Sequence, residues 1–259
     1  MASAAGHVPP IFVSHGTPML GDLAARAAEL GTWSRDLPRP RSILVVSSHW
    51  RAPVLTRGST AARPALLHEA DEPAALQATA WSAPGAPDLA YELHQLLPVE
   101  RDPTRAWDSG VWLPLLAMYP EAEVPVLQLS LVLGATPRSL FAIGRKIGVL
   151  AARGALLVGS GAITHNLEAI DPRVDAPPVG WAREFDSWIA NLLADAEHDE
   201  LLQWRTKAPN ARLAQPPGSH LDPLFVMAGA ASLYEHGVGF PLRGFDHGTV
   251  SRRAVQFGR

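Results

Sequence analysis

Three histidines follow short apolar segments of the chain, and imidazole side chains can bind a metal ion or exchange protons. His15 follows PPIFVS, His49 follows SILVVSS, and His165 follows ALLVGSGAIT. Each apolar run is rich in aliphatic residues and predicts a buried strand. Because ligands collect where the strands of an open α/β sheet end, imidazoles from three separate strands could converge on one metal ion or one substrate.

A fourth histidine, His220, follows Pro-Pro-Gly-Ser and is expected to open a helix capped by Gly218 or Ser219. Any one of the four could instead be a buried histidine bonded to the backbone. Their joint presence at segment ends favours a metal-binding or catalytic use. Neutral imidazoles suit iron, zinc, copper and nickel, so the residue types alone leave the metal open.

Several other chemistries are excluded by what the sequence lacks. The chain has no cysteine, which removes disulfides, thiolate metal sites and cysteine nucleophiles. The motifs HExxH, GxSxG and GxxxxGK[ST] are absent. Gly159-Ser160-Gly161 resembles a phosphate-binding loop only superficially, because it lacks the lysine of that motif.

Composition predicts an ordinary soluble globular protein. The 259 residues are 47% hydrophobic and 18% charged, and the formal net charge is −3. This charge gives no attraction to nucleic acid or to an anionic membrane. The first residues lack the basic and apolar regions of a signal peptide, and no apolar run approaches the length of a membrane helix. A cytoplasmic location is therefore expected, and the oligomeric state is left open.

Strand-like and helix-like segments alternate nearly from end to end, which predicts one α/β domain over residues 1–259. Expected strands lie at 10–14, 42–48, 124–131, 155–159 and 249–257, and expected helices at 20–31 (closed by Gly31), 87–97, 110–118, 137–152, 181–202 and 220–236.

The order of the motifs SHGTP, SSHW, SGAITHN and SHLDPLF resembles the LigB-type (class III) extradiol ring-cleavage dioxygenases, in particular their DOPA 4,5-dioxygenase-like branch. The resemblance extends over essentially the whole chain. It includes PRPRSILVVSSHW near residue 40, MYPEAEVPVLQLSL near residue 120 and the terminal GTVSRRAVQFG.

This resemblance implies a LigB-like fold, in which helices flank a central mixed sheet. It further implies a non-haem Fe(II) site with His15, His49 and His220 as ligands, with Zn(II) as the alternative metal. His165 would lie beside the metal as acid and base, a role suited to a pKa near neutrality. The implied reaction uses O₂ to open the ring of a small catechol-type substrate next to its diol.

Two segments depart from the family pattern. Relatives commonly have histidine where this chain has Ser109, close to substrate or oxygen, and serine can donate a hydrogen bond there but cannot shuttle a proton at neutral pH. The loop at 68–73 is acidic and lacks the aromatic residues of relatives. We hypothesise that His247 enters the pocket and replaces the lost imidazole. An exposed turn histidine is the competing interpretation.

Three functions are compatible with these residues. The leading one is a metal-dependent extradiol dioxygenase. The alternative is a zinc-dependent, hydrolase-like enzyme on the same scaffold, because three-histidine zinc can lower the pKa of its bound water to about 7. A metal-binding protein without turnover is the third. Asp108 and Glu69 are further candidate ligands or partners of the ligands.

Overall fold

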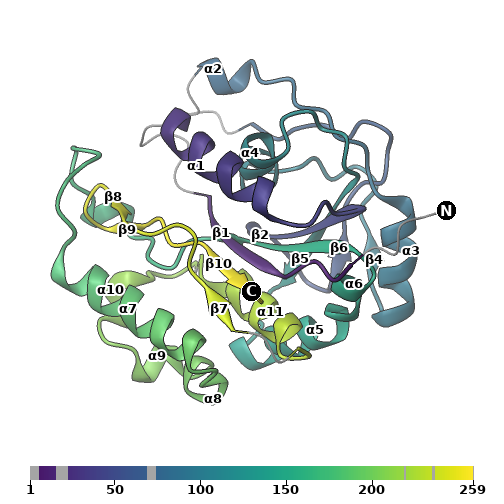
Figure 1. The fold of residues 1–259 in the computed structure, drawn as a ribbon. Coiled ribbons are helices and arrows are strands. Elements are labelled where there is room, and N and C mark those ends of the chain that lie inside the picture. Colours follow the sequence, from purple (N-terminus) through teal and green to yellow (C-terminus); the bar gives the residue numbers. More distant parts are fainter. Residues whose placement is uncertain (1–5, 16–22, 69–73, 219, 235–236, 259) are drawn as a thin grey trace.

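The computed structural model describes residues 6–15, 23–68, 74–218, 220–234 and 237–258. Within them, an eight-stranded sheet has the order β4-β3-β5-β2-β6-β1-β10-β7, and β8 and β9 form a separate pair (Figure 1). The strands are β1 (Ile11–Ser14), β2 (Ser42–Ala52), β3 (Thr56–Arg57), β4 (Glu100–Arg101), β5 (Val126–Val132), β6 (Ala155–Gly161), β7 (Val238–Gly239), β8 (Phe245–Asp246), β9 (Val250–Ser251) and β10 (Val255–Phe257).

The four central strands, β5-β2-β6-β1, run parallel. β10 pairs antiparallel with both β1 and β7, and β3 pairs antiparallel with β5, so the sheet is mixed as predicted. Because the central strands are parallel, their carboxyl ends lie at one edge of the sheet. β1 and β10 come from opposite ends of the sequence and lie side by side, which joins the two ends of the chain in one sheet.

Successive residues of the central strands face different cores, because side chains alternate along a strand. Ile11 and Val13 of β1 belong to the core beneath α1 and α4, whereas Phe12 belongs to the core on the opposite face, beneath α5 and α11. Both faces are buried, which explains why these strands read as continuous apolar runs.

The helices cover both faces of the sheet (Figure 1). Their bounds are α1 (Leu23–Asp36), α2 (Ala74–Gln77), α3 (Pro87–Leu96), α4 (Ser109–Met118), α5 (Pro137–Ile147), α6 (Val149–Ala152), the 3₁₀ turn η1 (Leu167–Ala169), α7 (Gly180–Ala194), α8 (His198–Leu201), α9 (Trp204–Lys207), α10 (Ala211–Ala214) and α11 (Asp222–Ala231). The predicted fold class is confirmed, whereas the extent of one domain over 1–259 stays a prediction. No helix in the described ranges is long and apolar enough to cross a membrane.

Several expected element boundaries were wrong. The helix expected at 137–152 is divided into α5 and α6, and the helix expected at 181–202 ends at Ala194 and is followed by α8. Gly31 does not close the first helix, which continues to Asp36. A β-carbon at Gly31 would lie 3.0 Å from the carbonyl oxygen of Ala117, so this glycine allows α1 to approach α4. The expected strand at 249–257 is instead two short strands, because the chain between β9 and β10 turns to bond the Arg252 N–H to the Gly244 carbonyl.

Candidate metal centre and active site

Three of the four predicted histidines meet at the carboxyl-terminal edge of the sheet. One ring nitrogen from each of His15, His49 and His220 lies within 4.8 Å of the others. The ring centroids are separated by 4.7 Å for His15–His49, 5.6 Å for His15–His220 and 5.4 Å for His49–His220, and the rings are edge-on to one another. Three edge-on imidazoles with converging nitrogens can bind one metal ion.

A β-bulge in β2 positions His49. Val46 pairs with Leu129 of β5, but the next paired residue of β2 is Arg51, opposite Leu131. The residues between them, 47–50, are therefore out of register with β5 and include His49. Bulges redirect side chains next to active sites, and here the bulge places His49 beside His15, which directly follows β1. β2 continues to Ala52, beyond the predicted end of the strand at 48.

His220 is held by its backbone in the loop before α11. Its N–H donates to Gln215 Oε1 at 2.9 Å, and its carbonyl accepts from the Ala162 N–H at 3.0 Å. A β-carbon at Gly161 would lie 2.0 Å from this carbonyl oxygen, so the close approach requires glycine. The prediction that His220 opens the helix was wrong, because these loop contacts delay α11 to Asp222. Of the two predicted caps, Gly218 is not the N-cap of α11, which is Leu221, and Ser219 lies outside the described residues.

His165 lies beside the three-histidine group rather than in it. Its ring stacks on that of His220, with centroids 3.6 Å apart and an interplanar angle of 13°. The carboxyl-terminal end of α10 holds both residues, because the His165 N–H donates to the Ala214 carbonyl at 2.9 Å and the His220 N–H donates to Gln215. This geometry separates three candidate ligands from one candidate acid or base.

Two serines contact the outer nitrogens of the candidate ligands. Ser160 Oγ lies 3.0 Å from His15 Nδ1, and Ser109 Oγ lies 3.2 Å from His49 Nδ1. His15 Nε2 is buried and has no hydrogen-bond partner in the described part of the chain. In the tautomer that leaves Nε2 to bind a metal, each Nδ1–H donates to its serine. The residues present therefore fit a divalent metal ion.

Asp108 anchors the start of α4 and does not join the three-histidine group. Its carboxylate is buried and accepts hydrogen bonds from Ser47 and Gln128. It also forms an ion pair with Arg105. A β-carbon at Gly110 would lie 2.4 Å from Ser47 Oγ. Glycine and this carboxylate together let α4 approach β2, which brings Ser109 to His49. Glu69, the other candidate ligand, lies outside the described residues.

His247 is buried, so its interpretation as an exposed turn residue was wrong. It is 2% exposed and lies in the hairpin turn between β8 and β9, where its φ is +54°. Nδ1 lies 2.8 Å from the Asp171 carbonyl oxygen, and Nε2 is buried with no partner among the described residues. It is not part of the three-histidine group.

Burial keeps three of these imidazoles neutral. It holds the pKa of His15 well below its ordinary value, and repulsion from the neighbouring histidines lowers that pKa further. Burial, followed by repulsion from His165 and His49, lowers the pKa of His220 to about 2. Burial lowers the pKa of His165 to about 4, below the near-neutral value expected from the resemblance. Neutral imidazoles are the form that binds metal.

These depressed pKa values predict that the metal-free protein loses stability in acid. Below about pH 6.5 the unfolded chain protonates these histidines while the folded chain does not. Each then reduces the free energy of unfolding by up to ~1.4 kcal/mol per pH unit, until the pH reaches its folded pKa. Denaturant titrations between pH 6.5 and 4.5 with a chelator present would measure this slope.

The variant His165→Gln removes one of these titrating groups. The slope should then decrease by roughly one proton's contribution above pH 4, the folded pKa of His165. His94→Gln is the matched control, because His94 is exposed on α3. An unfolding free energy that does not change with pH in the wild-type protein would contradict this prediction.

Sequence reasoning missed the contacts that hold the site. Ser160 appeared only as part of a weak phosphate motif, although strand alternation from Val158 places it on the face of β6 toward α1 and α4. No sequence signal identified Gln215. Arg252 and Arg253 form ion pairs within the protein, with Glu29 and Asp186 respectively.

A profile of the family described as the catalytic LigB subunit of aromatic ring-opening dioxygenase matches residues 2–250. The chain belongs to the LigB family. A crystal structure of an uncharacterized Escherichia coli K12 protein matches with a TM-score of 0.79 and 30% identity, and the alignment covers 97% of this chain and 100% of that one.

Three LigB relatives carry the name 4,5-DOPA dioxygenase extradiol. The Beta vulgaris protein is 36% identical over 85% of both chains. The Escherichia coli protein is 35% identical over 97% of this chain and 95% of its own, and the Portulaca grandiflora protein is 34% identical over 95% and 94%. This LigB protein is therefore a non-haem extradiol ring-cleavage dioxygenase, as predicted, and LigB dioxygenases depend on a metal.

Proposed function

We propose that His15, His49 and His220 hold Fe(II) and that the substrate is a catechol of the DOPA type. The observation that carries the ligand assignment is the convergence of the three ring nitrogens within 4.8 Å, together with the partnerless, buried Nε2 of His15. The substrate class follows from the name shared by the relatives, 4,5-DOPA dioxygenase extradiol.

A metal held by these residues would supply Lewis-acid and redox chemistry. Iron is favoured over zinc because zinc has no redox chemistry, whereas this reaction reduces O₂. The chain's own residues provide position and proton transfer. Ser109 and Ser160 fix two of the imidazole rings, and the stack of His165 on His220 keeps a neutral imidazole beside the bound diol.

His165 is assigned as the group that accepts a phenolic proton. Its low pKa keeps the ring neutral at pH 7, so that one ring nitrogen has a free lone pair. After ring opening the same nitrogen would return the proton to the product. The hydrogen bond from the His165 N–H to the Ala214 carbonyl, at the end of α10, holds this residue in place for the transfer.

The test is O₂ uptake by anaerobically Fe(II)-loaded protein with DOPA and a panel of other catechols. Zn(II)-loaded protein is the control. We expect uptake that depends on iron and on a free catechol diol, with a yellow ring-opened product. Turnover by the zinc form without O₂ consumption would instead favour the hydrolase-like alternative, and stoichiometric metal binding without turnover would favour the non-catalytic one.

Ser109 and Ser160 are predicted to tune metal affinity. Removing a partner of a metal-binding histidine typically weakens metal binding about 10- to 100-fold. We expect Ser109→Ala and Ser160→Ala to weaken Fe(II) or Zn(II) affinity by this amount, measured by competition with a chromophoric chelator. Ser48→Ala is the control. It is an alanine substitution in the β2 bulge that carries His49, and it should leave metal affinity within about threefold of wild type. Unchanged affinity in both test variants would remove the proposed positioning role.

His247 is proposed to act in place of the imidazole that relatives have at the position of Ser109. The support is its burial and its partnerless Nε2. We expect His247→Ala to lower turnover about 10-fold or more without a change in metal content. Unchanged turnover would remove the idea. A cytoplasmic location and the absence of nucleic-acid and membrane partners stay predictions.

A further inference from the structure

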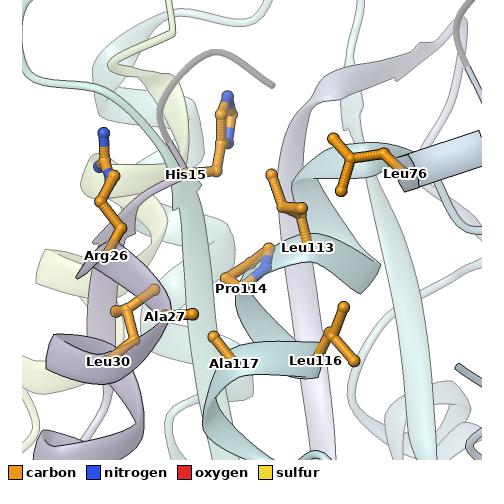
Figure 2. A pocket seen from close by; sticks show the side chains of 9 residues that line it. All are labelled: His15, Arg26, Ala27, Leu30, Leu76, Leu113, Pro114, Leu116 and Ala117. Carbon is orange, nitrogen blue, oxygen red and sulfur yellow. The ribbon is translucent and has the colours of Figure 1, made fainter. Parts of the chain in front are cut away.

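An apolar cavity of about 250 Å³ lies between α1 and α4 and reaches His15 (Figure 2). His49 and His220, the other two candidate ligands, do not line it. Its apolar walls come from three helices: Ala27 and Leu30 of α1, Leu76 of α2, and Leu113, Leu116 and Ala117 of α4.

Among the described residues, the polar side chains that line this cavity belong to His15 and Arg26, and the charge of Arg26 is neutralised within the protein. Arg26 forms an ion pair with the buried carboxylate of Asp246 and donates to the Ser14 carbonyl at 2.8 Å. The His15 ring is held by Ser160. The described lining therefore offers apolar contact and no unpaired charge, which disfavours a charged or strongly polar occupant.

The cavity's position disfavours the catechol as its occupant. A diol that chelates the metal must face the point where His15, His49 and His220 converge, beside His165. Of these four histidines only His15 lines the cavity. Among the described residues, the cavity thus meets the metal centre only at His15.

We infer that this cavity binds O₂ and supplies it to the metal centre from the His15 side. The inference rests on the proposed function, which requires O₂ at that centre. Apolar cavities in proteins bind xenon and other small apolar molecules. O₂ is likewise small and apolar, so an aliphatic cavity next to the site would raise its local concentration.

Xenon is the first probe, because it reports the cavity without needing activity. Crystals of the zinc-loaded protein under xenon pressure should show a xenon atom between Ala27 and Ala117. Xenon absent from this cavity at pressures that fill other apolar cavities would overturn the inference, even if the protein is an active dioxygenase.

Cavity-filling variants are the second probe. We expect Ala27→Phe and the milder Ala117→Leu to exclude xenon and raise the KM for O₂ about fivefold or more, with the KM for catechol within about twofold. Ala28→Phe is the matched control, because Ala28 is the exposed neighbour on α1. A KM for O₂ unchanged in variants that exclude xenon would overturn the supply role. A selective rise in the KM for catechol would assign the cavity to the aromatic substrate instead.

Wild-type protein that takes up no O₂ with any catechol would refute the proposed function and, with it, the supply of O₂. The xenon result separates the two failures. A xenon-filled cavity in an inactive protein would contradict the proposed reaction, whereas an empty cavity in an active protein would contradict this inference alone.

Discussion

The variant His15→Ala should bind no stoichiometric metal and should lose ring cleavage. Two imidazoles would remain, and two neutral ligands hold a divalent ion far less tightly than three. We expect kcat/KM for the catechol to fall by more than about 10³-fold, which corresponds to ~4 kcal/mol of lost transition-state stabilisation. Metal content by elemental analysis and O₂ uptake would measure the two effects.

The fold of the His15 variant can be checked separately. Because burial lowers the pKa of His15, the free energy of unfolding of the metal-free wild-type protein decreases in acid. The free energy of unfolding of the metal-free variant should therefore depend less steeply on pH below about 6.5. His94→Ala on α3 is the control and should retain metal and activity. Full metal content in a folded His15→Ala protein would refute the assignment of His15 as a ligand.

The variant His165→Gln should separate catalysis from metal binding. We expect kcat to fall about 10²- to 10⁴-fold, the usual contribution of a positioned acid or base. Metal affinity should stay within a few-fold of wild type, because His165 stacks on His220 and lies outside the group of three converging nitrogens. Single-turnover kinetics and metal titration on the same preparation would give both values.

Either of two results would contradict this role for His165. Loss of metal would make His165 a fourth ligand. A wild-type kcat would mean that another group, with His247 as the first candidate, accepts the phenolic proton. His94→Gln is again the matched control, since it makes the same substitution at an exposed site.

Each proposal is tested by a different measured quantity, so that one can fail while the others hold. Ligand variants change metal content, the serine variants change metal affinity, His165 variants change turnover, and cavity variants change the response to O₂. One set of purified proteins measured by metal titration, O₂ uptake and xenon binding therefore tests the whole site.

Local patterns in the sequence predicted the main elements closely. The helix expected at 87–97 is observed at Pro87–Leu96, because proline at the first helical position marks the start. The strand expected at 155–159 is observed at Ala155–Gly161. Strands buried on both faces are apolar nearly throughout, and such a continuous apolar run can be recognised in a single sequence.

Local patterns failed where a distant contact outweighs local preference. Gly31 is a typical helix stop, but it continues α1 because the neighbouring helix needs the space that a side chain would fill. His220 lies outside α11 because Gln215 and Ala162 bind its backbone first. His247 is buried because the hairpin that carries it packs on the loop at Asp171 and Val174.

Residue types and their order along the chain were enough to predict the fold class, the family and the four histidines. Which three imidazoles converge, and what each one contacts, depends on how distant segments pack together. His15 meets a serine 145 positions away, and His49 meets one 60 positions away. Such partners depend on strand order, on the bulge in β2 and on the glycines that permit close approach, and these arise only when the whole chain has packed.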